Sequence, residues 1–198
     1  MLRRGRLRES RYAATLELMN DPHEAIRPLM RVRQVREFTD VPVEPAALDA
    51  IVDSARWSGS SQNKQPWRFI LIREPSTLRA IAEAGLPHTR SLTTAAAAIA
   101  IVLPQEPGSK VSHGYDEGRA AERILIAATL LGLGAGISWI NSEARPAIAA
   151  LLGLPDDRFV RTIAAIGHPT AAAKEPKKPR GQARLPREET VFKERWPR

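Results

Sequence analysis

The sequence predicts a domain that mixes helices and strands, with a sheet covered by helices. In several segments the apolar residues recur every three to four positions, as they do in amphipathic helices. Between these segments lie short runs that are apolar at almost every position, which is typical of buried strands. The chain has 198 residues, and this length suggests one domain or at most two small ones.

The helical segments differ in length and in how they begin and end. The expected helices span 23–30, 45–57, 76–84, 115–131 and 143–152. Ser76 can cap its helix, and Gly132 and Gly153 follow the last periodic residues, where glycine commonly ends a helix. Asp116 and Glu117 would lie in the first turn of the longest helix, where acidic side chains complement the helix dipole.

Four apolar runs are expected to form the strands. They span 67–73, 98–103, 135–140 and 161–166. The chain from Pro169 onward is rich in Pro, Lys and Arg and has little periodicity, so we expect it to wrap over another surface rather than fold alone. We therefore divide the chain into a basic arm (1–20), a folded body (21–170) and a C-terminal extension (171–198) that belongs to the same domain.

The net charge of +8 is unevenly distributed along the chain. Residues 1–40 hold nine basic and six acidic side chains, residues 41–170 hold twelve of each, and residues 171–198 hold nine basic and four acidic ones. A nucleic-acid-binding fold usually carries basic residues on its body. The neutral body argues against that function. A basic nucleic-acid-binding module is nevertheless one of the hypotheses that we consider.

The absence of cysteine excludes several kinds of site. With no Cys in the sequence, there is no thiol nucleophile, thiolate-bound zinc or iron–sulfur cluster. No apolar run approaches the roughly 20 residues of a membrane span, and no secretory signal follows the basic start. The absence of Cys fits a reducing cytoplasm, so we expect a cytoplasmic protein. We expect no metal site, because the four histidines lack metal-ligand spacing.

The most informative stretch is 58–69, which reads SGSSQNKQPWRF. It joins a helix to a strand and supplies many neutral donors and acceptors but no acid or base. Such a loop suits an uncharged polar ligand such as a heterocyclic ring or a polyol chain. Alternatively, it is an ordinary surface loop of turn-forming residues.

Two further segments carry residue types that bind ligands. In RVRQVREF (31–38), three arginines cluster without an intervening acid, and Arg binds phosphate with paired donors; the alternative is a solvated basic segment. In GLGAGISWI (132–140) the glycines follow a helix and precede a strand, which is the wrong order for a dinucleotide fingerprint. These small residues would let the backbone approach a flat ligand closely.

Taken in order, these segments resemble the FMN-dependent nitroreductase family, from about residue 23 to the C-terminus. RVRQVREF resembles the family's Arg-x-Ser-x-Arg/Lys-x-Phe phosphate motif, and SGSSQNKQPWRF resembles its Pro-Ser-Ser-x-Asn-x-Gln-Pro-Trp loop. The long helix and GLGAGISWI are similar to its central helix and flavin-contacting strand. The closing segments GHP (167–169) and ARLPREETVFKERW (183–196) resemble its Gly-Tyr-Pro and Arg-x-Pro segments.

The resemblance implies an α+β fold with a mainly antiparallel sheet and a C-terminal tail that wraps the partner subunit of a homodimer. It implies two FMN molecules at the interface, each bound by residues of both subunits. The implied FMN-binding residues are Arg33, Gln34, Arg36 and Arg184 at the phosphate, Ser60, Ser61, Asn63 and Gln65 from the polar loop, and Ser138, Trp139 and Ile140 along the ring. Two departures stand at the phosphate motif, where Val32 replaces the family's first Arg and Gln34 its Ser.

The resemblance also implies the reaction. Electrons from NADH or NADPH would pass through FMN to a small-molecule acceptor such as a nitroaromatic or a quinone, in a ping-pong cycle. The flavin carries this chemistry, so no catalytic side chain is expected. The alternative is a flavin-binding protein of the same fold that uses O2 or an unusual substrate.

Overall fold

The computed structural model describes residues 21–175 and 184–197. The expected basic arm (1–20) and residues 176–183 of the expected extension lie outside the described residues. The described helices are α2 (Pro22–Met30), α3 (Pro45–Arg56), α4 (Pro75–Ala84), α5 (Lys110–Leu130), α6 (Arg145–Leu151), α7 (Ala171–Lys174) and α8 (Arg187–Thr190), with 3₁₀ turns η1 (Ser61–Asn63), η2 (Arg90–Thr93) and η3 (Pro107–Ser109). The strands are β1 (Arg68–Ile72), β2 (Ala97–Pro104), β3 (Gly134–Trp139) and β4 (Arg158–Gly167).

The four strands form one antiparallel sheet in the order β1-β2-β4-β3. β2 and β4 lie in the centre and are buried at most positions, which explains why their sequences are apolar on both faces. The expected α+β fold with an antiparallel sheet is confirmed.

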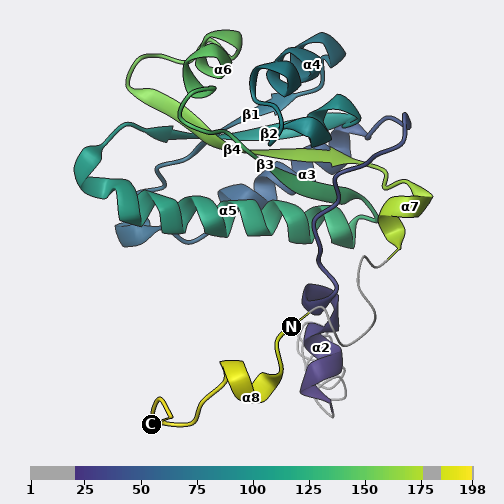
Figure 1. Cartoon of the computed structure of the whole chain (residues 1–198), viewed down its shortest axis with the longest axis vertical. Helices are drawn as coiled ribbons and strands as arrows, with labels where there is room; N and C mark the ends of the chain where they lie inside the picture. The colour runs from purple at the N-terminus through teal and green to yellow at the C-terminus, as the bar shows by residue number, and fades with distance from the viewer. Residues whose placement is uncertain (1–20, 176–183, 198) are drawn as a thin grey trace, which may run out of the picture.

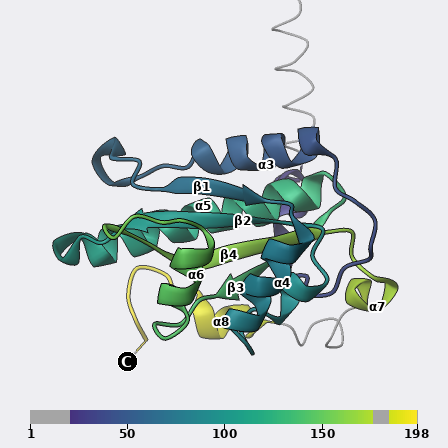
Figure 2. The same ribbon diagram turned by 90° about the horizontal axis from the view of Figure 1, so that it is seen from above.

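Helices cover both faces of the sheet, α3 and α5 on one and α4 and α6 on the other (Figure 1). The view from above shows α3 beside β1, at one edge of the sheet (Figure 2). On the first face, Ile51 of α3 and Ile124 of α5 pack against alternate residues of β2, such as Ile99. On the second face, Ile81 of α4 and Ile148 of α6 pack against the intervening residues of β2, whose side chains point the other way.

Most predicted elements are confirmed, with shifts at their ends. Gly132 and Gly153 follow α5 and α6 with φ values of 74° and 62°, in the left-handed region that favours glycine. The expected cap at Ser76 is wrong, because α4 begins one residue earlier at Pro75 and Glu74 occupies the cap position. Pro at the first helical position fits this start, since its missing N–H would have had no helical partner.

The longest helix begins at Lys110, five residues before the expected start. Asp116 and Glu117 therefore lie in its second turn, and both are buried, at 1% and 3% exposure. The prediction that they complement the dipole in the first turn is wrong. Among the described residues, no helix is both long and apolar enough to cross a membrane.

Candidate functional site

The arginine-rich segment lies along the outer edge of β3. Gln34 forms a parallel bridge with Ala135 of β3. Its side-chain Oε1 accepts hydrogen bonds from the backbone N–H of Ile137, at 3.2 Å, and from Nη2 of Arg36, at 3.0 Å. The segment expected to hold a phosphate is thus fixed to the strand expected to contact the ring.

The glycines of β3 make this close approach possible. The N–H of Val35 donates to the carbonyl of Ala135 at 2.8 Å, which brings the two backbones together. A Cβ on Gly136 would lie 2.1 Å from the carbonyl oxygen of Val35, and one on Gly134 would lie 2.9 Å from the Val35 side chain. The small residues of GLGAGISWI therefore accommodate the neighbouring backbone of 34–36.

The same segment also contacts the chain that follows β4. The N–H of Thr39 donates to the carbonyl of His168 at 2.8 Å, and Phe38 bridges Pro169. The guanidinium of Arg33 donates to the backbone carbonyl of Lys174, at the end of α7. The structure therefore brings together three of the segments selected from the sequence, namely 31–38, 132–140 and 167–169.

The polar loop is anchored on a different element. The backbone N–H of Ser61 lies 3.2 Å from both carboxylate oxygens of Asp116, a buried residue of α5. Within the loop, the N–H of Gln65 donates to Ser60 Oγ at 2.9 Å, and its side-chain Nε2 donates to Asn63 Oδ1 at 3.2 Å. The predicted side chains therefore hold the loop in shape, and Ser61, Asn63 and Gln65 remain exposed.

The backbone of this loop is strained. Gln62, Asn63 and Gln65 have φ values of 52°, 55° and 49°, in a region that non-glycine residues seldom adopt. Each such residue costs on the order of 1 kcal/mol or more, and these conformations cluster at binding sites. Three within four residues favour the interpretation of the loop as a ligand-binding segment over that of an ordinary turn.

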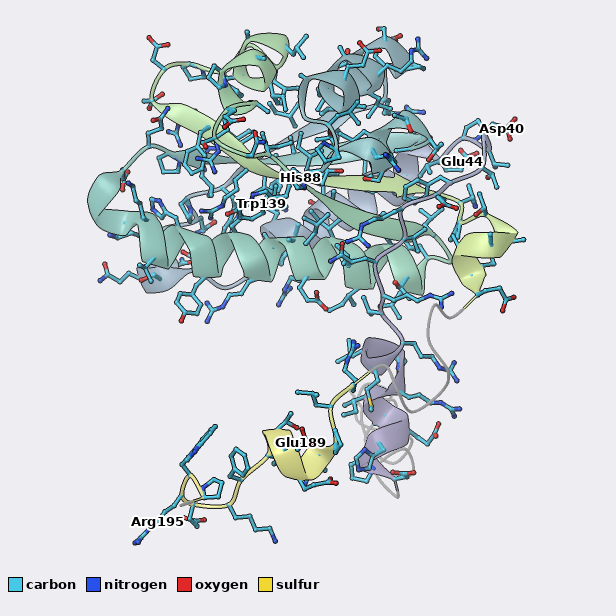
Figure 3. All side chains as sticks on the ribbon, in the orientation of Figure 1. Asp40, Glu44, His88, Trp139, Glu189 and Arg195 are labelled. Carbon is cyan, nitrogen blue, oxygen red and sulfur yellow. The ribbon has the colours of Figure 1, made fainter. Side chains whose placement is uncertain are left out.

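At the end of β3 only one of the three predicted ring contacts has an accessible side chain. Ser138 is buried and its Oγ lies 2.7 Å from Oγ of Ser91, while Ile140 is fully buried and its N–H donates to the carbonyl of Arg161 at 2.8 Å. Trp139 is 48% exposed and lies between the sheet and α5 (Figure 3). A ligand beside this strand would meet the Trp139 side chain and the backbone.

A partly buried ion pair that the sequence reasoning missed lies beside Trp139. Arg161 donates from Nε and Nη2 to Oε2 of Glu117 on α5, the Nε contact measuring 2.8 Å. The guanidinium carbon is 5.5 Å from the ring centre of Trp139, within the range of a cation–π contact. The pair joins residues 44 positions apart. The only indication in the sequence was that both charged residues lie within apolar, periodic segments.

Arg161 also occupies an irregular position in the sheet. Ile101 pairs with Thr162 and the next residue of β2, Val102, pairs with Val160, so Arg161 is the extra residue of a β-bulge. Bulges bend a strand and redirect a side chain, often next to binding sites. Arg184, the remaining predicted residue, lies in the described tail just before α8.

Comparison with known proteins relates the chain to the nitroreductases. Residues 29–115 match the model of the nitroreductase family. A protein of Archaeoglobus fulgidus, named as a candidate NADH dehydrogenase/NAD(P)H nitroreductase, is 29% identical over 153 residues, which is 74% of this chain and 86% of that protein. The resemblance to the nitroreductase family is therefore confirmed.

Solved structures show a similar fold over most of the chain. An FMN-dependent nitroreductase from Clostridium difficile is 26% identical, with a TM-score of 0.71 over 83% of this chain and 96% of that one. A candidate nitroreductase from Desulfovibrio desulfuricans, solved in complex with FMN, is also 26% identical, with a TM-score of 0.70 over 87% and 97% of the two chains. The chain is thus similar to nitroreductases in both sequence and fold.

Proposed function

We propose that this nitroreductase-like protein is an FMN-dependent oxidoreductase that transfers electrons from NADH or NADPH to a small acceptor such as a nitroaromatic or a quinone. The observation that carries the proposal is the hydrogen bond between Gln34 and the backbone of Ile137, at 3.2 Å. It joins the segment proposed to hold the FMN phosphate to the strand proposed to lie along the ring. The similar structure solved with FMN supports the choice of cofactor.

The donor set at the phosphate end fits FMN. Arg33 and Arg36 are exposed beside β3, and guanidinium groups are suited to paired contacts with phosphate oxygens. Val32 packs against the hydrophobic core, and it offers no donor where the family has its first Arg. We therefore assign the phosphate to Arg33, Arg36 and, from the tail, Arg184.

The rest of the cofactor would meet neutral groups. The strained loop offers the exposed side chains of Ser61, Asn63 and Gln65, whose hydroxyl and amide groups match the mixed donors and acceptors of a flavin ring and ribityl chain. Trp139 offers an aromatic face and a strand backbone. When bound, FMN supplies the electron-transfer chemistry, so these residues need only bind and orient it.

Two subunits would complete the site. The polar loop is anchored on α5 through Asp116, whereas the arginine segment is fixed to β3. We infer that the loop of one subunit reaches the FMN held by the arginines of the other. α2 and α8 have no buried residues and lie away from the sheet (Figure 1). Exposed apolar side chains in α2 and in the tail after α8, including Met30 at 67% and Trp196 at 79%, are surfaces that a homodimer would cover.

The absorbance spectrum of the purified protein tests the proposal. We expect a yellow protein that releases FMN on denaturation and whose flavin is bleached by NADH or NADPH without oxygen. Colourless protein that takes up no added FMN would refute the proposal. Flavin that neither nucleotide reduces would instead favour the alternative of a flavin protein that uses O2 or an unusual substrate. A cytoplasmic location stays a prediction.

A further inference from the structure

A cavity of about 910 Å³ lies outside the residues assigned to FMN. Its walls come from the end of β2, the first turns of α5, the start of α6 and the first half of β4. Its volume falls in the range of about 300–1,000 Å³ that is usual for small-molecule sites. None of the residues assigned to FMN lines it, so the cavity is separate from the proposed phosphate and ring contacts.

The walls of the cavity carry more positive than negative charge. The cationic lining residues are Lys110, Arg145, Arg158 and Arg161, and the acidic ones are Glu106 and Asp156. Two of the cations have acidic partners, because Arg161 binds Glu117 and Arg158 lies 3.5 Å from Asp157. Within residues 21–175 and 184–197, Lys110 and Arg145 have no carboxylate oxygen within 4.0 Å. These two cations are therefore available to an anion from outside the chain.

Packing holds Arg145 in place instead of an ion pair. Its guanidinium carbon lies 5.4 Å from the ring centre of Phe159, and that of Arg161 lies 6.0 Å from the same centre. Nε of Arg145 is buried and has no acceptor in the part of the chain that the structure describes. A guanidinium that is already ordered loses little freedom on binding, and its planar donors match a carboxylate or a phosphate.

The remaining walls are apolar. The apolar lining residues include Pro104, Pro146, Ala149, Ala150, Leu154 and Pro155. A fully hydrated inorganic ion would gain nothing from such walls, whereas an organic anion could bury its carbon skeleton against them. The lining thus favours a ligand with one charged end and an apolar body.

We propose that this cavity binds a small organic anion, with Arg145 and Lys110 holding its carboxylate or phosphate group and the proline-rich wall holding its apolar body. The site is linked to the proposed redox site through Arg161, which lines the cavity and also stacks on Trp139. The inference rests on the charges and walls of the cavity and not on the proposed function.

Calorimetric titration of the purified full chain tests the proposal, with benzoate, phenyl phosphate and uncharged benzamide as probes. The double variant Lys110→Gln/Arg145→Gln removes both cations. The matched control, Arg79→Gln/Lys193→Gln, makes the same charge change at exposed positions away from the cavity. At least one anion should bind the unaltered chain. Its affinity for the cavity variant should be at least about tenfold lower, since a lost charged hydrogen bond costs at least about 1.5 kcal/mol.

The preferred anion identifies the charged group of the ligand. Selective binding of phenyl phosphate assigns a phosphate ligand, and selective binding of benzoate a carboxylate ligand. The proposal is overturned if neither anion binds, if benzamide binds equally well, or if the cavity and control variants bind alike. Ala150→Trp, which fills the cavity from an exposed position without changing charge, should also weaken binding, and this keeps the test valid if the double variant does not fold. Flavin content, measured in each sample, separates this result from that of the FMN proposal.

Discussion

Arg161 of β4 and Glu117 of α5 form an ion pair between a bulged strand and the helix that crosses beneath it. The Glu117 side chain is 4% exposed and that of Arg161 is 23% exposed. Oε1 of Glu117 is buried without a hydrogen-bond partner among the described residues, so Arg161 compensates the carboxylate through one oxygen. Removal of either partner would leave a charge in a poorly hydrated place.

Replacement Glu117→Gln should therefore destabilise the protein. Breaking a buried pair costs about 3–5 kcal/mol, and the partial exposure of Arg161 reduces the expected loss to about 2 kcal/mol. Urea unfolding measures this difference. Glu122→Gln, at an exposed position of the same helix, should change stability by less than about 0.5 kcal/mol. If Glu117→Gln behaves like this control, the pair contributes nothing to stability.

Replacement Asp116→Ala should release the polar loop. Its carboxylate accepts from the N–H of Ser61 at 3.2 Å, and an unsatisfied partly buried donor costs about 1–3 kcal/mol. The amide of Ser61 should exchange with solvent faster, as hydrogen-exchange measurements on the loop would show. Asp53→Ala breaks only an exposed pair with Arg56 and should leave the exchange unchanged. Unaltered exchange in Asp116→Ala would mean that the loop is held by its internal hydrogen bonds alone.

Replacement Gly136→Ala should separate the arginine segment from β3. The new Cβ would lie 2.1 Å from the carbonyl oxygen of Val35, so one of the two backbones must move. We expect a loss of about 1–3 kcal/mol, as for other overpacked positions, measured as a lower melting temperature. Gly118→Ala on α5 meets nothing within 4 Å and should be neutral or stabilising by up to about 1 kcal/mol. Equal melting temperatures for the two variants would contradict this geometry.

The double replacement Arg36→Ala/Arg184→Ala should weaken FMN retention, because it removes two of the three guanidinium groups assigned to the phosphate. The loss of charged hydrogen bonds predicts at least a tenfold increase in the FMN dissociation constant, from about 1.5 kcal/mol or more. Equilibrium dialysis with fluorescence detection measures it. Arg56→Ala/Arg79→Ala, with the same charge change on α3 and α4, should bind FMN normally. Unchanged affinity in the first variant would show that the phosphate lies elsewhere.

The sequence was sufficient for the elements that follow a simple periodicity. Leu48, Ile51 and Ala55 are buried as the pattern in 45–57 predicts, and the apolar runs became the strands. The start of α5 was missed because Lys110–Gly114 contains no apolar repeat. Helix formation there depends on tertiary packing, in which His113 is 5% exposed.

The candidate site was predictable only in part, because its geometry depends on distant contacts. The arginine cluster indicated a phosphate contact, but the side-chain bond from Gln34 to Ile137 spans 103 positions. Similarly, the roles of Asp116 and Glu117 depend on Ser61 and Arg161, which lie 55 and 44 positions away. Local spacing cannot show such partners, and it led to the wrong interpretation of two buried carboxylates as dipole partners.

The arginine segment along β3 also affects the colloidal behaviour of the protein. By bonding Val35 to Ala135, it occupies part of the backbone at one edge of the sheet that could otherwise recruit a strand from another molecule. β1 forms the opposite edge, and charged Arg68 and Arg73 stand at the two ends of its apolar run. Charges in such positions oppose aggregation. The segment proposed to hold a cofactor thus also hinders edge-to-edge association of the sheet with another molecule.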